Sequence, residues 1–261
     1  MRIVVFGTGG AGGYFGAQLT RAGADVVFIA RGVMGPETFV VPLQNGVEAP
    51  SQLTAALGAE HVLGGLCGTF SWVTAPGRIR SVGAGNFIKF AELDNRPSDR
   101  AEQLRRVFEG AGVNAEIPSD IHKALWQKFL LVTSFGGVGA VTRAPIGIIR
   151  TIPETRRLLE QCMQEVLALA RARQVALADT VVADTMTVVD SLAARGTTSL
   201  QRDIMDGKPV RTGILERRGG TSGAGRGGRN AFTRIYLSVL ASSGNAGARQ
   251  SDVSHLNCMQ S

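Results

Sequence analysis

The fold is decided close to the N-terminus, where residues 2–13 read RIVVFGTGGAGG. Residues 2–6 form a mostly β-branched, apolar run, which is typical of a buried parallel strand. The run ends at Gly7. An amphipathic stretch at residues 13–22 follows, and then a second apolar run at residues 26–30. Strand, glycine turn, helix and strand in this order predict the opening βαβ unit of a dinucleotide-binding fold.

The glycines of this turn have the spacing G-x-G-x-x-G. Gly7 permits the tight turn, Gly9 lets the backbone approach a pyrophosphate, and Gly12 lets helix and strand pack closely. The phosphates would lie on amides at the helix N-terminus, where the helix dipole favours negative charge. The residues expected to contact the cofactor here are Gly7, Thr8, Gly9, Gly10, Ala11 and Gly12. A loop that is merely rich in glycine is the alternative, and the flanking strands and helix argue against it.

Arg31 ends the second apolar run. NAD-binding folds usually place a carboxylate there for the ribose hydroxyls, and that carboxylate would repel a 2′-phosphate. A cation at this position favours NADP as the cofactor. A solvated arginine just past a strand is the alternative.

Composition limits the other classes of function. The chain is 44% hydrophobic and 19% charged, which is ordinary for a globular protein. No signal peptide or membrane-spanning run is expected, and the scattered cysteines and histidines predict a reducing cytoplasm and no metal site. The tail after residue 210 carries seven arginines against Glu216 and Asp252, so most of the net charge of +7 lies there and the body is nearly neutral.

The periodicity changes near Pro118. Before it, we expect strands at residues 39–43 and 61–67, a hairpin at 79–91 that turns around Gly83 and Gly85, and a helix from the N-cap Ser98 to Glu109. After it, we expect helices at residues 119–134, 153–174 and 179–194. The predicted fold is an incomplete α/β Rossmann-like domain at residues 1–118, followed by an all-α domain at 119–210 and an irregular tail at 211–261.

Four segments in order carry a family resemblance. They are the glycine-rich opening, PLQNGV at residues 42–47, LWQKF at 125–129 and TSLQRDI at 198–204. Together they resemble the 2-dehydropantoate 2-reductase (ketopantoate reductase) family over residues 1–31 and about 36–209. The resemblance implies NADPH-dependent reduction of ketopantoate to pantoate, on the path to pantothenate and coenzyme A.

The resemblance assigns three site residues. Lys128 matches the proton donor, and an ammonium group can both stabilise and protonate the developing alkoxide. Asn45 matches an asparagine between nicotinamide and substrate, and Ser199 matches a serine that binds the substrate carboxylate. The structural alternatives are an exposed helix lysine, an Asn-Gly turn and a helix N-cap. Val132 departs from the family, which usually has an asparagine there, so a different 2-oxo acid is an alternative substrate.

Two departures from the family affect larger segments. Between residues 31 and 36 the family has on the order of 50 more residues, including a central strand next to the first one. After Val210 the helical periodicity stops. With a suitable choice of synonymous codons for residues 211–219, reading one base later gives ELESWNGAV, which resembles the family's next helix. A one-base frameshift is therefore our interpretation of the tail.

Three hypotheses follow. The chain is a reductase of ketopantoate or a related 2-oxo acid, or a non-catalytic remnant of that family, or an Arg/Gly-rich binder of single-stranded nucleic acid through residues 217–229. The last is the weakest, because that segment contains no aromatic residue. The expected partner is a small 2-oxo acid, with no membrane, and the resemblance also allows a homodimer.

Overall fold

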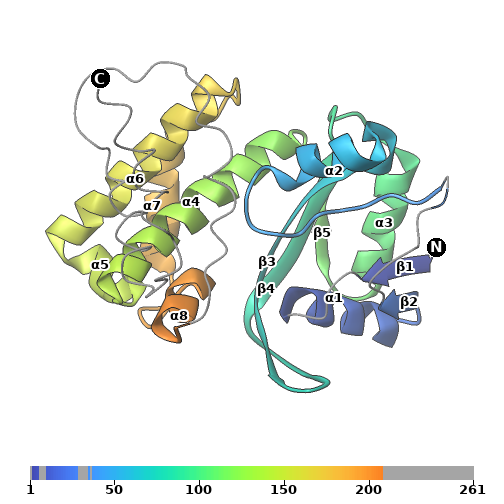
Figure 1. The fold of residues 1–261 in the computed structure, drawn as a ribbon, viewed down its shortest axis with the longest axis horizontal. Coiled ribbons are helices and arrows are strands. Elements are labelled where there is room, and N and C mark those ends of the chain that lie inside the picture. Colours follow the sequence, from blue (N-terminus) through green and yellow to red (C-terminus); the bar gives the residue numbers. More distant parts are fainter. Residues whose placement is uncertain (1, 6–9, 29–34, 36, 208–261) are drawn as a thin grey trace, which may run out of the picture. The chain divides into compact units, whose positions relative to one another are not determined.

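The computed structural model describes residues 2–5, 10–28, 35 and 37–207 of the chain (Figure 1). Two compact units divide between Trp126 and Gln127. The expected domain boundary near Pro118 lies in the segment before helix α4 (Ile121–Thr142), whereas the units divide inside this helix.

The predicted βαβ unit is present at the start of the first unit. Strand β1 (Arg2–Val5) pairs in parallel with β2 (Asp25–Phe28), with Arg2 opposite Asp25 and Val5 opposite Phe28. Helix α1 (Gly10–Arg21) connects the two strands. Among the described residues, β1 and β2 pair only with each other, whereas a complete doubly wound fold would continue the sheet on the other side of β1.

A second sheet has the order β3-β4-β5. Strand β3 (Leu63–Ala75) is antiparallel to β4 (Arg78–Glu92), and β4 is parallel to β5 (Asn114–Glu116). The predicted strand at residues 61–67 is therefore confirmed from Leu63 onward, and it extends to Ala75. Strand β5 was not predicted, because three residues give no readable period.

The predicted position of the hairpin turn is wrong. Residues 78–92 form a single strand, and the chain reverses at Pro76 and Gly77, where Gly77 has φ +71°. A proline followed by a glycine with positive φ suits a tight turn. Gly83 and Gly85 lie inside β4, where the register shifts between the Gly68–Phe87 and Phe70–Val82 pairs.

The predicted strand at residues 39–43 is also wrong. Val40 makes one isolated parallel bridge to Val62, with its amide donating to the His61 carbonyl at 2.8 Å and its carbonyl accepting from the Leu63 amide at 3.0 Å. In a continuing parallel ladder, the next amide to donate to the segment at residues 62–63 would be that of residue 42. Pro42 has no amide hydrogen, so the ladder stops.

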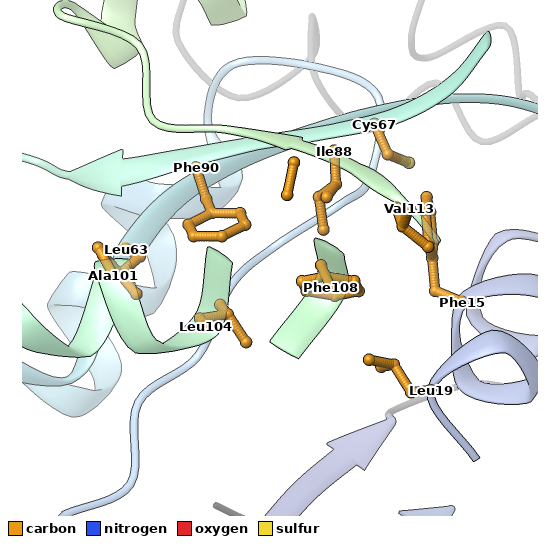
Figure 2. Close-up of a cluster of buried hydrophobic side chains, with 11 residues drawn as sticks. Phe15, Leu19, Leu63, Cys67, Ile88, Phe90, Ala101, Leu104, Phe108 and Val113 are labelled. Atoms are coloured by element: carbon orange, nitrogen blue, oxygen red, sulfur yellow. The ribbon is translucent and has the colours of Figure 1, made fainter. Parts of the chain in front are cut away.

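One hydrophobic cluster joins the elements of the first unit (Figure 2). Helix α1, both long strands, β5 and helix α3 (Asp99–Gly110) contribute to it. Ser98 is the N-cap of α3, as predicted, and its hydroxyl accepts a hydrogen bond from the Ala101 amide at 3.2 Å. Two short helices, α2 (Ala49–Leu57) and the 3-10 turn η1 (Ala59–His61), were not predicted.

The second unit is helical. Its elements are the remainder of α4 and the helices α5 (Ile146–Thr151), α6 (Pro153–Ala172), α7 (Val181–Ser191) and α8 (Ser199–Met205). The predictions for α6 and α7 are confirmed, including proline at the first turn of α6. Helix α4 runs beyond the predicted end at Ser134, and Gly136 and Gly139 are buried against α8 rather than terminating the helix.

Within the described residues, α4 is the one helix long and apolar enough to cross a membrane by length and composition. Its most apolar window is 67% buried within the structure. The core helices of soluble proteins pass the same test, so this finding does not by itself assign α4 to a membrane.

Candidate functional site

The N-terminus of α1 is the described part of the predicted cofactor site. Gly10, Ala11 and Gly12 form its first turn, which contains no aspartate or glutamate. The partial positive charge of the helix end is therefore not offset by a carboxylate in that turn, as an anion site requires. Gly7, Thr8, Gly9 and Arg31 lie outside the described residues, so their roles stay predictions.

Helix α1 is held in place by its apolar face. The Phe15 ring meets the Phe108 ring of α3 edge to face, with the centroids 5.9 Å apart, and Leu19 is 1% exposed. Figure 2 shows Phe15 and Leu19 directed from α1 toward the same cluster as Phe108. The orientation of the helix end within the first unit is thus fixed by packing.

Asn45 lies in an exposed bend between Leu43 and α2. The next residue, Gly46, has φ +115°, which glycine adopts without the steric cost of a side chain. The chain before the bend lies tightly on β3, because a Cβ at Gly65 would lie 2.4 Å from Val41 Cγ1 and 2.9 Å from the Pro42 carbonyl oxygen. The bend agrees with the Asn-Gly turn interpretation, and substrate contact by Asn45 stays a prediction.

Arg100 of α3 ties the segment before this bend to the sheet. Its guanidinium donates to both carboxylate oxygens of Glu92, at 2.6 and 2.5 Å, and also to the Glu60 carbonyl. The guanidinium carbon lies 5.4 Å from the centroid of the Phe39 ring, within cation–π range. The hydrogen bonds from Arg100 lower the pKa of Glu92 below its ordinary value, against the opposing effect of burial.

Lys128 lies in the second turn of α4 and is partly buried. At 100° per residue, Val132 and Gly139 fall within about 40° of Lys128 around the helix axis, so the three share one face. The residue one turn beyond the lysine is therefore a valine on the same side of the helix. An apolar side chain therefore lies one turn beyond Lys128 on its face of the helix.

Ser199 is the first residue of α8 and is exposed. The N-cap is its neighbour Thr198, whose hydroxyl accepts a hydrogen bond from the Gln201 amide at 3.1 Å. Helix capping therefore does not account for Ser199. A Cβ at Gly136 would meet Leu200 at 3.4 Å, so the start of α8 lies against α4 two turns, or about 12 Å along the axis, beyond Lys128.

Lys128 and the start of α8 thus both belong to the second unit, about 12 Å apart along the α4 axis. Asn45 and the N-terminus of α1 belong to the first unit. In the part of the chain that the structure describes, no three histidine, cysteine, aspartate or glutamate side chains are grouped so that they could hold a metal ion.

Sequence reasoning missed Gln201, a fully buried polar residue of α8. Its Nε2 donates to the Ala144 carbonyl at 3.1 Å, and its Oε1 would lie 2.7 Å from a Cβ at Gly139. A glutamine within TSLQRDI carries no helix-face signal of its own. The one available signal was its spacing of three residues from Ile204, which is also buried.

Family models match most of the chain. The model described as ketopantoate reductase PanE/ApbA matches residues 3–34 and 30–95, and its C-terminal counterpart matches residues 120–212. The chain belongs to the ketopantoate reductase family. The N-terminal match to this family breaks at residues 30–34, and the C-terminal match ends next to the point where the helical periodicity stops.

Two relatives give the scale of the similarity. The uncharacterized oxidoreductase YkpB of Bacillus subtilis (strain 168) is 23% identical over 264 residues, covering 80% of this chain and 87% of the relative. The 2-dehydropantoate 2-reductase of Nostoc sp. (strain PCC 7120 / SAG 25.82 / UTEX 2576) is 24% identical over 233 residues, covering 66% and 73%. The first alignment leaves on the order of 50 positions without a counterpart in this chain, more than one βαβ unit.

Solved structures of the ketopantoate reductase family share the fold. The 2-dehydropantoate 2-reductase from Geobacter metallireducens GS-15 has a TM-score of 0.76 at 24% identity, covering 93% of both chains. A D-mandelate dehydrogenase in complex with NADH has a TM-score of 0.72 at 15% identity, covering 79% of this chain and 86% of the other. These likenesses show a Rossmann-type fold with an α-helical C-terminal half, and the family models identify the chain as a ketopantoate reductase-like oxidoreductase.

Proposed function

We propose that this protein reduces a 2-oxo acid with NADPH, with ketopantoate as the first candidate substrate and pantoate as its product. The observation that carries the proposal is the position of Lys128. This lysine lies on the α4 face against which the segment with Ser199 packs, in a family of reductases. Pantothenate and coenzyme A synthesis would be the pathway served.

The described residues fit a dinucleotide. The β1-α1-β2 unit is formed, α1 begins at Gly10, and its first turn has no carboxylate. Amides of residues 7–12 would hold the pyrophosphate, and Arg31 would pair with the 2′-phosphate that distinguishes NADP from NAD. When bound, the reduced nicotinamide supplies a hydride to the keto carbon.

Side chains of this protein would bind the substrate and supply the proton. The Lys128 ammonium donates a hydrogen bond to the keto oxygen and then its proton, so that the product is a 2-hydroxy acid and the lysine is left neutral. The Ser199 hydroxyl donates a hydrogen bond to the substrate carboxylate. Asn45 orients the keto group relative to the nicotinamide.

Val132 favours a second candidate substrate. A valine on the Lys128 face offers no hydrogen bond to a substrate hydroxyl group. A 2-oxo acid with a purely apolar side chain would therefore fit this face better than ketopantoate, whose side chain ends in a hydroxyl group.

The interrupted sheet favours a second candidate role, that of a non-catalytic family member. Among the described residues, no strand lies between the β1-β2 pair and the β3-β4-β5 sheet, and the YkpB alignment leaves a βαβ-sized segment unmatched. Loss of a central strand would remove one wall of the cofactor crevice. A nucleic-acid-binding tail is a third candidate, and it concerns residues outside the described part.

The test follows NADPH absorbance with purified full-length protein and a panel of 2-oxo acids that includes ketopantoate and 2-oxoisovalerate. We expect turnover that falls about a hundredfold or more in Lys128→Ala. Lys123→Ala is the matched control, because Lys123 lies on the same helix and its pair with Asp120 is exposed. A robust rate unchanged by Lys128→Ala would refute the mechanism, and no turnover with any acid would favour the non-catalytic role.

The site of action and the assembly state are proposals of the same kind. The protein would act in the cytoplasm, where the buried thiols of Cys67 and Cys162, which form no disulfide, stay reduced. A homodimer is the proposed assembly state. No membrane or nucleic-acid partner is needed for the proposed reaction.

A further inference from the structure

Gln201 is the most deeply buried polar side chain of the second unit's α8, with 0% exposure. Its amide spans from α8 to the segment that joins α4 and α5, where Nε2 donates to the Ala144 carbonyl at 3.1 Å. Its Oε1 accepts no hydrogen bond within the described residues. A buried amide with one unsatisfied oxygen is unfavourable compared with an apolar side chain of similar shape, so its presence needs a reason.

The Gln201 amide packs closely against a glycine of α4. Oε1 lies against Gly139 of α4, where a Cβ would stand 2.7 Å from the oxygen and 3.2 Å from Cδ. At Gly136, one turn earlier, the nearest atom to such a Cβ is 3.4 Å away, an ordinary contact. Of these two glycines, only Gly139 is needed to make room for the Gln201 amide.

Several contacts hold helix α8. Its seven residues are too few for a stable isolated helix, and the Thr198 cap satisfies only its first turn. The preceding loop is tied to α5 by the Gly196 carbonyl, which accepts from the Ile146 amide at 2.9 Å. Along α8 itself Ile204 is buried, and the Gln201 amide adds a directional hydrogen bond to Ala144 that restricts rotation about the helix axis.

We propose that Gln201 is a positioning residue for substrate binding. By seating its amide between the Ala144 carbonyl and Gly139, it sets the rotation of α8 and so the direction of the Ser199 hydroxyl toward the substrate carboxylate. This inference rests on the proposed function, in which Ser199 contacts the 2-oxo acid.

The experiment is a double-mutant cycle in the full-length protein. Gln201→Met keeps the length of the side chain and removes the amide donor, and it is combined with Ser199→Ala. We expect Gln201→Met alone to raise the KM for the 2-oxo acid about tenfold and to leave the KM for NADPH unchanged. In the Ser199→Ala background the same substitution should change the KM for the 2-oxo acid less than about twofold.

A second pair of variants reaches the same contact from α4. Gly139→Ala should displace the Gln201 amide and raise the KM for the 2-oxo acid in the same way, while Gly136→Ala should leave it unchanged. Equal effects of Gln201→Met with and without Ser199, or no effect at all, would overturn the role of Gln201 alone. If the wild-type protein neither binds nor reduces any 2-oxo acid, both this inference and the proposed function are overturned.

Discussion

Lys128 is distinguished from the other described lysines by its position. Lys89 lies 2.7 Å from Glu116, and Lys123 lies 3.6 Å from Asp120. Lys128 stands on the α4 face that α8 contacts farther along the helix, whereas Lys89 and Lys123 lie outside the second unit. Its residue type was evident from the sequence, but its shared face with Gly139 depends on α4 continuing past Ser134.

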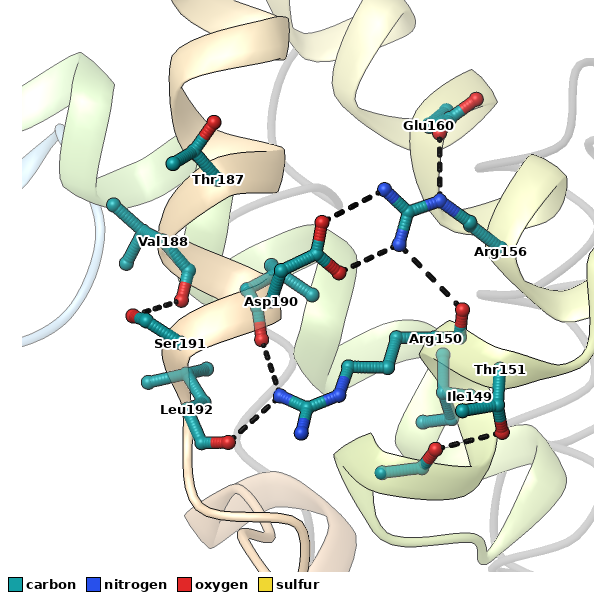
Figure 3. Close-up of polar contacts among 12 residues, drawn as sticks. Ile149, Arg150, Thr151, Arg156, Glu160, Thr187, Val188, Asp190, Ser191 and Leu192 are labelled. Carbon is teal, nitrogen blue, oxygen red and sulfur yellow. Dashed lines mark hydrogen bonds and ion pairs between the residues drawn. The ribbon is translucent and has the colours of Figure 1, made fainter.

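Arg150 is a second residue whose role is visible only in three dimensions. Its Nη1 donates to the Val189 carbonyl at 2.8 Å and to the Leu192 carbonyl at 2.7 Å, so α5 satisfies carbonyl groups at the C-terminus of α7 (Figure 3). Nearby, Arg156 holds Asp190 of α7 through two hydrogen bonds, at 2.6 and 2.9 Å. The two arginines tie α7 to α5 and α6.

We expect Arg150→Met to lower the free energy of unfolding by about 2 kcal/mol, because carbonyl groups would lose a charged donor. The measurement is urea unfolding followed by circular dichroism. Arg157→Met is the control, since Arg157 is an exposed residue of α6, and it should change the free energy little. Equal losses in both variants would mean that the two bonds do not stabilise α7.

Among the elements, the segment before Asn45 packs closely on β3 because Gly65 of that strand has no side chain. Gly65→Ala would place a Cβ 2.4 Å from Val41 Cγ1. We expect it to lower the free energy of unfolding by about 1–3 kcal/mol through overpacking. Gly110→Ala is the control, because a Cβ there meets nothing within 4 Å, and urea unfolding of both variants makes the comparison. A Gly65→Ala protein as stable as the control would contradict the close packing.

The link from α3 to β4 predicts a pH dependence of stability. Hydrogen bonds from Arg100 lower the pKa of Glu92 below its ordinary value of 4.5. A depressed pKa in the folded state means that this contribution is fully present above pH 4.5 and is lost as the pH falls through the folded-state value. Urea unfolding between pH 7 and pH 3 should therefore show a smaller loss of stability in Glu92→Gln than in the wild type. An identical pH dependence would contradict the pairing.

Sequence patterns predicted the elements whose signals are local. The β1-α1-β2 order, the Ser98 cap and the amphipathic α6 all follow from periodicity and capping. The predicted strand at residues 39–43 was wrong because a strand there needs successive hydrogen bonds to the neighbouring residues 61–63. Pro42 has no amide hydrogen to donate to them. Helix α8 was too short to show a period, and the buried Gln201 is explained only by a glycine in another helix.

In the whole molecule, the family relationship favours a working reductase, whereas the interrupted sheet favours a non-catalytic family member. The family models cover both halves of the chain, yet among the described residues the β1-β2 pair is separate from the β3-β4-β5 sheet. A folded domain has only about 5–15 kcal/mol of net stability, so loss of a central strand would have to be compensated by packing. The cluster that Phe15 and Leu19 form with α3 and both long strands supplies such packing.

We expect this chain to bind NADPH. Calorimetric titration of the full-length protein with NADPH and with NADH, on the wild type and on Arg31→Glu, tests this. The wild type should bind NADPH more tightly than NADH, and Arg31→Glu should lose about tenfold in affinity for NADPH while its affinity for NADH changes little. Binding of neither dinucleotide would refute the proposed function and identify the chain as a family member that has lost its cofactor.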